Sequence, residues 1–370
     1  FMGSGPLKGF TIVEFVGIGP GPFCGMILAD LGAEIIRIDR SSQHGHGNTI
    51  DFQHRSKLSL SADLKNPNTV NEIKKLLKNV DGLIEGFRPG VMERLGLGPE
   101  DCLEVNSNLV YGRMTGWGQD GPLAKTAGHD INYIALTGAL EAMGRKNETP
   151  PPPLNLVGDF GGGGMFLALG IVSALLNIKN GGKGQVVDAA MVDGASVLMS
   201  MFYAFKASGF WQDERESNML DGAAHFYDSY ECADNKFLAV GSIEPQFYSV
   251  LLEKLEISDP KFQDQMNRDK WPELKAVMRE TIKQKTRDEW ADIFDGTDAC
   301  VAPILSLSEA PEHHHMKARK SFVEIDGVIQ PAPAPRFSDT TTEIQHSSVK
   351  AGQNNDEICE KFDLDRSCFS

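Results

Sequence analysis

Two strand–helix–strand patterns near the start of the chain restrict the fold more than any other feature of the sequence. Residues 10–19 read FTIVEFVGIG, residues 20–34 read PGPFCGMILADLGAE, and residues 35–40 read IIRIDR. Short apolar runs bounded by turn residues predict buried strands, and the longer segment between them predicts a helix. Residues 59–87 repeat the pattern as SLSADL, PNTVNEIKKLLKN and VDGLIEGF. Strands joined by a helix run parallel, so we predict an α/β fold with a parallel sheet.

The chain is too long for one hydrophobic core. Its 370 residues exceed the size at which single cores stop growing, and the texture of the sequence changes near residue 215. We predict a large domain over residues 1–215, a smaller α+β domain over residues 216–320, and a C-terminal segment over residues 321–370 that returns to the large domain.

The small domain is expected to contain an antiparallel hairpin around Asp234 and Asn235, followed by helices at residues 246–256 and 271–294. Beyond residue 331 the sequence is rich in Pro and Thr and has no periodicity. We therefore expect the tail to wrap over a surface rather than to enter a core.

One segment resembles a membrane span. Residues 160–178, FGGGGMFLALGIVSALLNI, carry no charge and have about the length that crosses a bilayer. The four glycines at its start shorten the part expected to be helical. We predict a helix that is apolar on all sides and buried inside the protein.

The net charge of −15 argues against nucleic acid or an anionic membrane as the main partner, because both require an excess of Lys and Arg. An anionic ligand needs a local basic cluster, and the predicted strand ends and turns of the first two units provide one at Arg37, Arg40, Arg55, Lys57, Lys65, Arg88 and Arg94. The alternative is that most of these side chains are solvated surface charges.

The six cysteines have neither metal-like spacing nor CxxC pairs, and the N-terminus lacks the regions of a signal peptide. We expect reduced thiols and an intracellular location, which is the cytoplasm in a bacterium and the mitochondrion or peroxisome in a eukaryote.

The first turn suggests a dinucleotide site, but its details disagree. Counting G-x-G-x-x-G from Gly17 or from Gly19 requires a third glycine where the chain has Pro22 or Cys24. The sequence therefore predicts the βαβ architecture without a nicotinamide cofactor.

Seven motifs together resemble the family III CoA-transferase superfamily, and in particular its racemase branch. They are GPGPFCGMILADLGAE, LIEGFRPGVMERLGLGPE, TGWGQDGP, GHDINYIALTG, PLNLVGDFGGGG, GKGQVVDAAMVDG and VGSIEPQFY, and the resemblance covers about residues 6–340. It implies that the large domain is Rossmann-like, that two subunits interlock as a homodimer, and that coenzyme A lies over the large domain. The acidic helical segment usual at the C-terminus of the family is poorly represented in this chain.

The resemblance places coenzyme A against residues that match the family's motifs: Arg40, Ala62, Asp63, Leu64, Lys65, Arg88, Arg94, Gly128, His129, Asp130, Ile131, Asn132 and Tyr133. The implied substrate is a 2-methylacyl-CoA thioester, and the implied reaction inverts its α-carbon. No cofactor beyond the coenzyme A of the substrate and no metal is expected, and neither nucleic acid nor a membrane is an expected partner.

The implied chemistry needs two acid/base groups on opposite faces of the α-carbon. The resemblance identifies them as His129 and Asp159. A position at a helix N-terminus should favour neutral, basic imidazole at His129, and the N–H of Asp130 could stabilise negative charge on the thioester oxygen. Asn155 is expected to hydrogen-bond Asp159, and Glu244 of the small domain to orient His129.

Other interpretations compete with this one. From pattern alone, His129 and Asp159 are more often helix caps than catalysts. A family III CoA-transferase would use Asp159 as a nucleophile, but the resemblance then implies a replaced histidine and a glycine-rich loop where this chain has His129 and Glu244. A CoA-binding protein without catalysis would be expected to lose one of the pair. The run His313, His314 and His315 is expected to be a solvated loop rather than a metal site.

Overall fold

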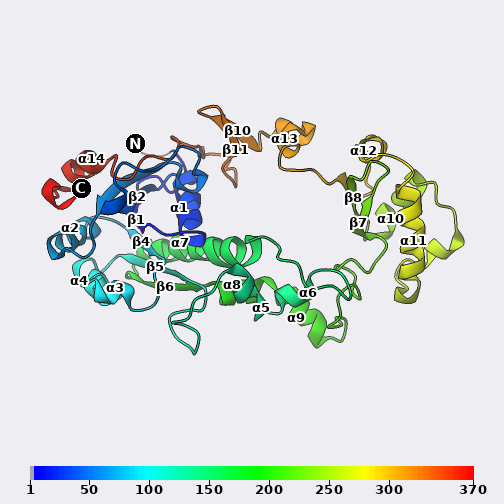
Figure 1. The fold of residues 1–370 in the computed structure, drawn as a ribbon, viewed down its shortest axis with the longest axis horizontal. Coiled ribbons are helices and arrows are strands. Elements are labelled where there is room, and N and C mark those ends of the chain that lie inside the picture. The colour runs from blue at the N-terminus through cyan, green and yellow to red at the C-terminus, as the bar shows by residue number, and fades with distance from the viewer. Residues whose placement is uncertain (1–3) are drawn as a thin grey trace. The chain divides into compact units, whose positions relative to one another are not determined.

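The computed structural model of the protein describes residues 4–370, so the first three residues of the predicted large domain lie outside the described part of the chain. The chain divides into two compact units (Figure 1). Unit 1 contains the described residues up to 137 together with residues 153–199 and 314–370, and unit 2 contains residues 138–152 and 200–313. The sequence placed the corresponding changes after residues 215 and 320.

Unit 1 is built on a six-stranded sheet whose strands all run parallel, in the order β3-β2-β1-β4-β5-β6. This confirms the predicted α/β fold with a parallel sheet. The strands are β1 (Thr11–Phe15), β2 (Glu34–Arg40), β3 (Lys57–Ala62), β4 (Gly82–Glu85), β5 (Val110–Thr115) and β6 (Gln185–Ala190).

Helices connect these strands, and several begin at a proline, which has the backbone angle of a first helical residue and lacks an N–H that would go unpaired. They are α1 (Pro20–Asp30), α2 (Pro67–Leu77), α3 (Val91–Arg94), α4 (Pro99–Val105), α5 (Asp130–Ala135), α7 (Met165–Lys179) and α8 (Met191–Leu198). The helix α13 (His314–Arg319), the antiparallel pair β10 (Phe322–Ile325) and β11 (Val328–Pro331), and α14 (Asn355–Phe362) complete unit 1.

Both faces of the sheet are covered. Adjacent residues of β1, Ile12 and Val13, are fully buried in two different apolar clusters, as the alternation of side chains along a strand requires. Continuous apolar strands are therefore stable here because neither face meets water.

The segment Leu156–Gly164 is a π-helix that continues directly into α7, so the glycines are helical rather than a break before the helix. The prediction that this helix is buried inside the protein is wrong, because Leu169 and Leu176 of α7 are largely exposed. Among the described residues, Leu156–Lys179 is the one helical stretch long and apolar enough to cross a membrane, and less than half of its most apolar window is buried.

The C-terminal segment also differs from its prediction. Ile358, Cys359 and Phe369 are buried in the same cluster as Val13 and Leu60, and α14 lies against β3. The tail therefore enters a core, and its residues Asn355–Phe362 form the helix α14. This contact could not be predicted, because residues 331–370 contain no long apolar periodicity.

Unit 2 is an α+β unit. Strands β7 (Tyr227–Glu231), β8 (Phe237–Gly241) and β9 (Val301–Pro303) form an antiparallel sheet, which confirms the hairpin predicted at Asp234 and Asn235. The helices of unit 2 are α6 (Ala139–Ala142), α9 (Ser200–Ala207), α10 (Pro245–Lys254), α11 (Trp271–Ile282) and α12 (Arg287–Phe294). Residues 271–294 thus form two helices, because the capping box of Thr286 and Glu289 starts a new one.

Candidate active site

The candidate site of unit 1 lies at the carboxyl ends of its parallel strands. The strand order reverses between β1 and β4, and ligands of such sheets bind where this reversal opens a crevice. The turn after β1 leads into α1 through Gly19, and the loop after β5 leads to His129 and α5. Asp159 faces the same region, because a Cβ atom at Gly19 would stand 3.3 Å from its Oδ2. Gly19 also has a φ of 72°, which favours glycine.

His129 is the N-cap of α5 rather than a residue of its first turn. Its backbone is extended, with φ −131° and ψ 176°, and its main-chain N–H donates to Oδ1 of Asn132 at 3.0 Å. This contact starts the helix and leaves the imidazole exposed. Among residues 4–370 the N–H of Asp130, at the first helical position, has no recorded hydrogen bond. It is therefore available to an anionic oxygen.

Tyr133 fixes the loop that carries His129. Its hydroxyl donates to the carbonyl of Gly128, and its ring meets the edge of Trp117 with centroids 4.8 Å apart. Burial raises the pKa of the Tyr133 hydroxyl, and the nearby positive charge of Arg88 opposes that rise. The hydroxyl is thus occupied within the protein, so Tyr133 contributes to a binding site mainly by holding the Gly128 backbone.

Asp159 lies in the first turn of the π-helix and is half-buried. Asn155 donates from Nδ2 to its Oδ2 at 3.1 Å, the contact expected from the sequence. The main-chain N–H of Asp159 donates to Oδ2 of Asp130 at 2.7 Å. Burial raises the pKa of the Asp159 carboxyl; the hydrogen bond from Asn155 opposes the rise, the negative charge of Asp130 adds to it, and His129 opposes it.

The glycines after Asp159 allow the π-helix to pack closely. A Cβ atom at Gly162 would stand 2.6 Å from the main-chain nitrogen of Ala195 in α8, and one at Gly164 would stand 2.8 Å from the carbonyl oxygen of Pro20 in α1. Side chains at these positions would push the π-helix away from both helices. The glycine run therefore sets the position of Asp159 relative to the turn before α1.

The residues predicted to bind coenzyme A divide into two groups. Arg40, Asp63, Lys65, Arg88 and Arg94 are exposed and follow the carboxyl ends of β2, β3 and β4, and Ile131 and Asn132 are exposed on α5. Leu64 is half-buried against the core, and Ala62 is buried and bridges to Phe369. Ala62 and Leu64 therefore shape the surface rather than presenting a polar side chain to a ligand.

Three residues of the expected basic cluster belong to the interior. Lys57 is fully buried and donates from Nζ to Glu14 at 2.7 Å and to the carbonyl of Pro22 at 2.9 Å. Arg37 pairs with Asp39, and Arg55 pairs with Asp30 and also donates to Pro331. The prediction that these three cations hold an anionic ligand is wrong, because buried carboxylates already neutralise them.

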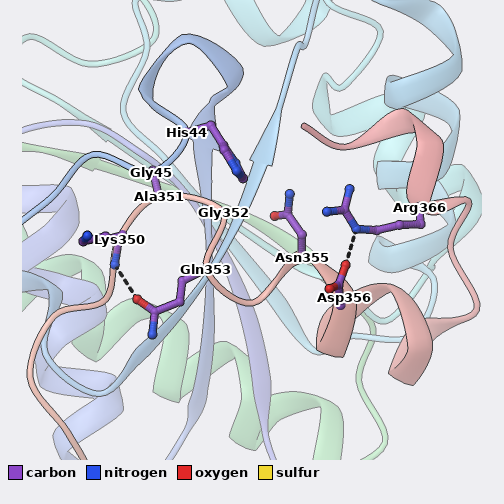
Figure 2. Close-up of a pocket in the computed structure, with 9 residues that line it drawn as sticks. All are labelled: His44, Gly45, Lys350, Ala351, Gly352, Gln353, Asn355, Asp356 and Arg366. Carbon is purple, nitrogen blue, oxygen red and sulfur yellow. Dashed lines mark hydrogen bonds and ion pairs between the residues drawn. The ribbon is translucent and has the colours of Figure 1, made fainter.

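A separate polar hollow of about 320 Å³ lies beside β2 and β3, where the C-terminal segment meets the loop after β2 (Figure 2). His44, Asn355 and Arg366 point toward one another in it, and Arg366 pairs with Asp356. None of the proposed catalytic residues lines this hollow.

Glu244 belongs to unit 2, where it is exposed and caps α10, so its predicted role toward His129 stays a prediction. The histidine run is not the expected loop, because His314 begins α13. Across residues 4–370 no group of His, Cys, Asp and Glu is arranged to hold a metal ion.

Sequence reasoning missed the side chain of Asp130, which was considered only for its N–H. It lies 29 residues from Asp159 in the chain, and no spacing rule connects the two. It also missed Gly19 as a neighbour of Asp159, although a glycine between a strand and a helix was a visible signal of close approach.

Comparison with known proteins identifies a matching family and two similar proteins that share one name. The pattern of CoA-transferase family III matches residues 7–355. A protein of Mus musculus named alpha-methylacyl-CoA racemase is 47% identical over 89% of this chain and 85% of its own length. The Homo sapiens protein of the same name is 44% identical over 97% of this chain and 94% of its own length.

A CaiB/baiF CoA-transferase family protein of Caenorhabditis elegans is 35% identical over 89% of this chain and 95% of its own length. Among solved structures, a CAIB/BAIF family protein of Brucella suis superposes with a TM-score of 0.82 at 25% identity, covering 97% of this chain and all of that one. The fold is therefore shared by a wider group than the racemases.

Proposed function

Since the chain belongs to CoA-transferase family III, we propose that it is a racemase that interconverts the two epimers of 2-methylacyl-CoA thioesters. The identities of 47% and 44% to two proteins named alpha-methylacyl-CoA racemase, over most of both chains, support this activity within the family. The observation that carries the mechanism is the hydrogen bond from the main-chain N–H of Asp159 to Oδ2 of Asp130, the residue after exposed His129, because it holds the half-buried Asp159 against the N-terminus of α5.

His129 and Asp159 act as the two acid/base groups. In one direction the neutral imidazole removes the α-proton from one face, and protonated Asp159 delivers a proton to the opposite face. In the other direction the carboxylate removes the proton and the imidazolium supplies one. The raised pKa of Asp159 serves both roles, because it brings the carboxyl nearer to the pH at which the enzyme must hold and release a proton.

The intermediate is an enolate whose charge develops on the thioester oxygen. The N–H of Asp130 is the group best placed to receive that oxygen, because it stands at the N-terminus of α5 without a recorded partner among residues 4–370. Proton transfer beside a thioester requires no metal when such a donor is in place. We propose that the coenzyme A portion contacts Arg40, Lys65, Arg88 and Arg94, whose exposed cations suit its phosphates.

The test is isotope exchange. Incubation with (2R)-2-methyldecanoyl-CoA in deuterated water should give both epimers, each with deuterium at the α-carbon, as read by mass spectrometry and chiral chromatography. Retention of the original α-hydrogen in both epimers would sink the proton-transfer mechanism.

Substitution of either acid/base group should stop the reaction. His129→Ala and Asp159→Asn should each lower kcat by at least about 100-fold, while the dissociation constant for coenzyme A changes little. Asp188→Asn is the control, because Asp188 is also a carboxyl of unit 1 with a raised pKa that accepts a main-chain N–H, from Gln119. Turnover like that of the wild type in either catalytic variant would refute the assignment.

The same assay separates the racemase from the transferase alternative. A transferase would exchange coenzyme A with a free acid, and hydroxylamine would trap the acyl group on Asp159. We expect neither outcome. Transfer to a free acid without α-deuteration would reverse the assignment.

We also propose that two copies of the chain associate. Unit 1 exposes an apolar face made of large side chains on β6 and on α7 and α8, which both contact β6. Exposed apolar side chains on adjoining elements are typical of an interaction surface. This face is formed by Met165, Leu169, Leu176, Val186, Val197 and Leu198. A second copy is the partner that the proposal assigns to it. An intracellular location is proposed as well, supported by six cysteines that are all free.

A further inference from the structure

The side chain of Asp130 is tied to Asp159 through the backbone. Asp130 is 6% exposed, and its Oδ2 accepts the main-chain N–H of Asp159 at 2.7 Å. That N–H lies in the first turn of the π-helix, where a helix has no partner of its own for it. Gly158 provides the space for the contact, because a Cβ atom there would stand 2.6 Å from the same oxygen.

The second oxygen of Asp130 has no such partner. Among the described residues, Oδ1 is buried and makes no hydrogen bond. A buried carboxylate with one unpartnered oxygen is costly, and the oxygen of a neutral amide at the same place could also accept the N–H of Asp159. The capping contact alone therefore does not explain why this position carries a charge.

The charge acts on the reacting carboxyl. The groups that act on Asp159 are Asn155, next to the start of the π-helix, and three residues at α5: His129, Asp130 and Tyr133, whose hydroxyl is neutral and donates to Gly128. Gly19, the neighbour on the α1 side, has no side chain. Asp130 is therefore the negative group beside Asp159, and it disfavours a second negative charge there.

We propose that the Asp130 side chain is a positioning residue for the reaction: it fixes the backbone of Asp159 and keeps a proton on the Asp159 carboxyl until the enolate accepts it. This inference rests on the proposed racemase function and assigns to the side chain a role separate from that of the Asp130 N–H. One residue then binds the enolate oxygen through its main chain and controls the proton donor through its side chain.

The inference predicts that the protonation of Asp159 limits kcat/KM at opposite ends of the pH range in the two directions of the reaction. Where Asp159 is the acid, kcat/KM falls at high pH because the free enzyme loses the proton of the Asp159 carboxyl. Where Asp159 is the base, kcat/KM falls at low pH as the carboxylate gains one. Removing the charge of Asp130 lowers the pKa of Asp159, so both limits should move to lower pH.

Asp130→Asn separates charge from position, because the amide oxygen still accepts the N–H of Asp159. We expect each of the two limits to move to lower pH by about one unit, and we expect kcat at the optimum to fall less than in Asp130→Ala. The control Asp188→Asn should leave both limits in place. Unchanged limits in Asp130→Asn would overturn the charge role.

Position is tested from both sides of the hydrogen bond. Asp130→Ala should lower kcat at least about tenfold at every pH with KM for the acyl-CoA nearly unchanged. Gly158→Ala, which presses a methyl group against Oδ2 without altering the charge, should lower kcat in the same way. Thermal unfolding of each variant identifies loss of folding. If Asp130→Ala does not fold, wild-type kcat in folded Gly158→Ala overturns the positioning role.

The two levels of proposal fail differently. Absence of α-deuteration in the wild type would reject the racemase function before any variant is compared. Deuteration in the wild type with unchanged pH limits and kcat across the variants would reject the role of the Asp130 side chain alone.

Discussion

Single side chains in this protein depend strongly on partners that are remote in sequence. Lys57 follows a turn in the chain and looks like a surface cation, yet it is fully buried against Glu14, 43 residues earlier. Burial lowers the pKa of Lys57 and raises that of Glu14, and each partner opposes the shift of the other. A pattern of residue types can predict that such a cation needs a partner when buried, but it cannot predict the burial.

His225 is a second case, and its surroundings predict acid sensitivity. Tyr248 donates its hydroxyl proton to the carbonyl of Phe262, so Nε2 of His225 must donate to the Tyr248 oxygen, and the buried Nδ1 is left without a partner among the described residues. Burial first, and the charge of Lys275 second, lower the pKa of His225 to about 4.

The unfolded chain therefore binds a proton at His225 before the folded one does, and stability falls as pH decreases from about 6.5 to about 4. The free energy of unfolding falls by roughly 3 kcal/mol across this pH range. His225→Gln keeps a donor for Tyr248 and does not titrate, so its thermal midpoint should decline less over this range. Equal pH dependence in urea or thermal unfolding of wild type and variant would contradict this account.

At the scale of elements, the glycine run after Asp159 shows what sequence can and cannot predict. The strands, the hairpin at Asp234 and the first helices follow from local patterns of apolar and turn residues, and they are present in the structure. The GGGG segment has no local pattern that favours a π-helix. Its conformation depends on contacts with α1 and α8, so its helical state was predictable only with those neighbours in place.

Gly162→Ala tests this dependence. The new methyl group would stand 2.6 Å from the nitrogen of Ala195, so α8 or the π-helix must move, and we expect a loss of about 1–3 kcal/mol in stability together with a lower kcat. Gly21→Ala in α1 is the matched control, because its nearest heavy atom would be 4.0 Å away. Equal unfolding midpoints and equal activity for the two variants would show that the close packing is not required.

At the scale of the whole molecule, the exposed apolar face of unit 1 decides whether the chain acts alone. Leu169 and Leu176 lie seven residues apart on α7, hence on one side of the helix, and are 63% and 59% exposed. Neither the uncharged segment nor its length revealed this asymmetry, because α7 is apolar all round and no polar stripe marks its outer side.

The double variant Leu169→Lys/Leu176→Lys should convert a dimer to a monomer at micromolar concentration, since four lysines would be buried in a symmetric interface. Light scattering after size-exclusion chromatography measures the change. Ile50→Lys is the control, because Ile50 is also 60% exposed but lies on the loop between β2 and β3. A wild-type monomer, or a double variant that still dimerises, would exclude this face as the interface.

The contact between β3 and the C-terminal segment determines the order in which the two units can fold during synthesis. The main-chain N–H of Ser61 donates to Oδ1 of Asn355, which lies 294 residues later in the chain. Unit 2 consists only of residues 138–152 and 200–313. During synthesis all residues of unit 2 are therefore made before α14, the last helix that packs against the large sheet. Until α14 is made, we expect the apolar cluster that it covers in unit 1 to be partly exposed, and a chaperone would bind such a surface.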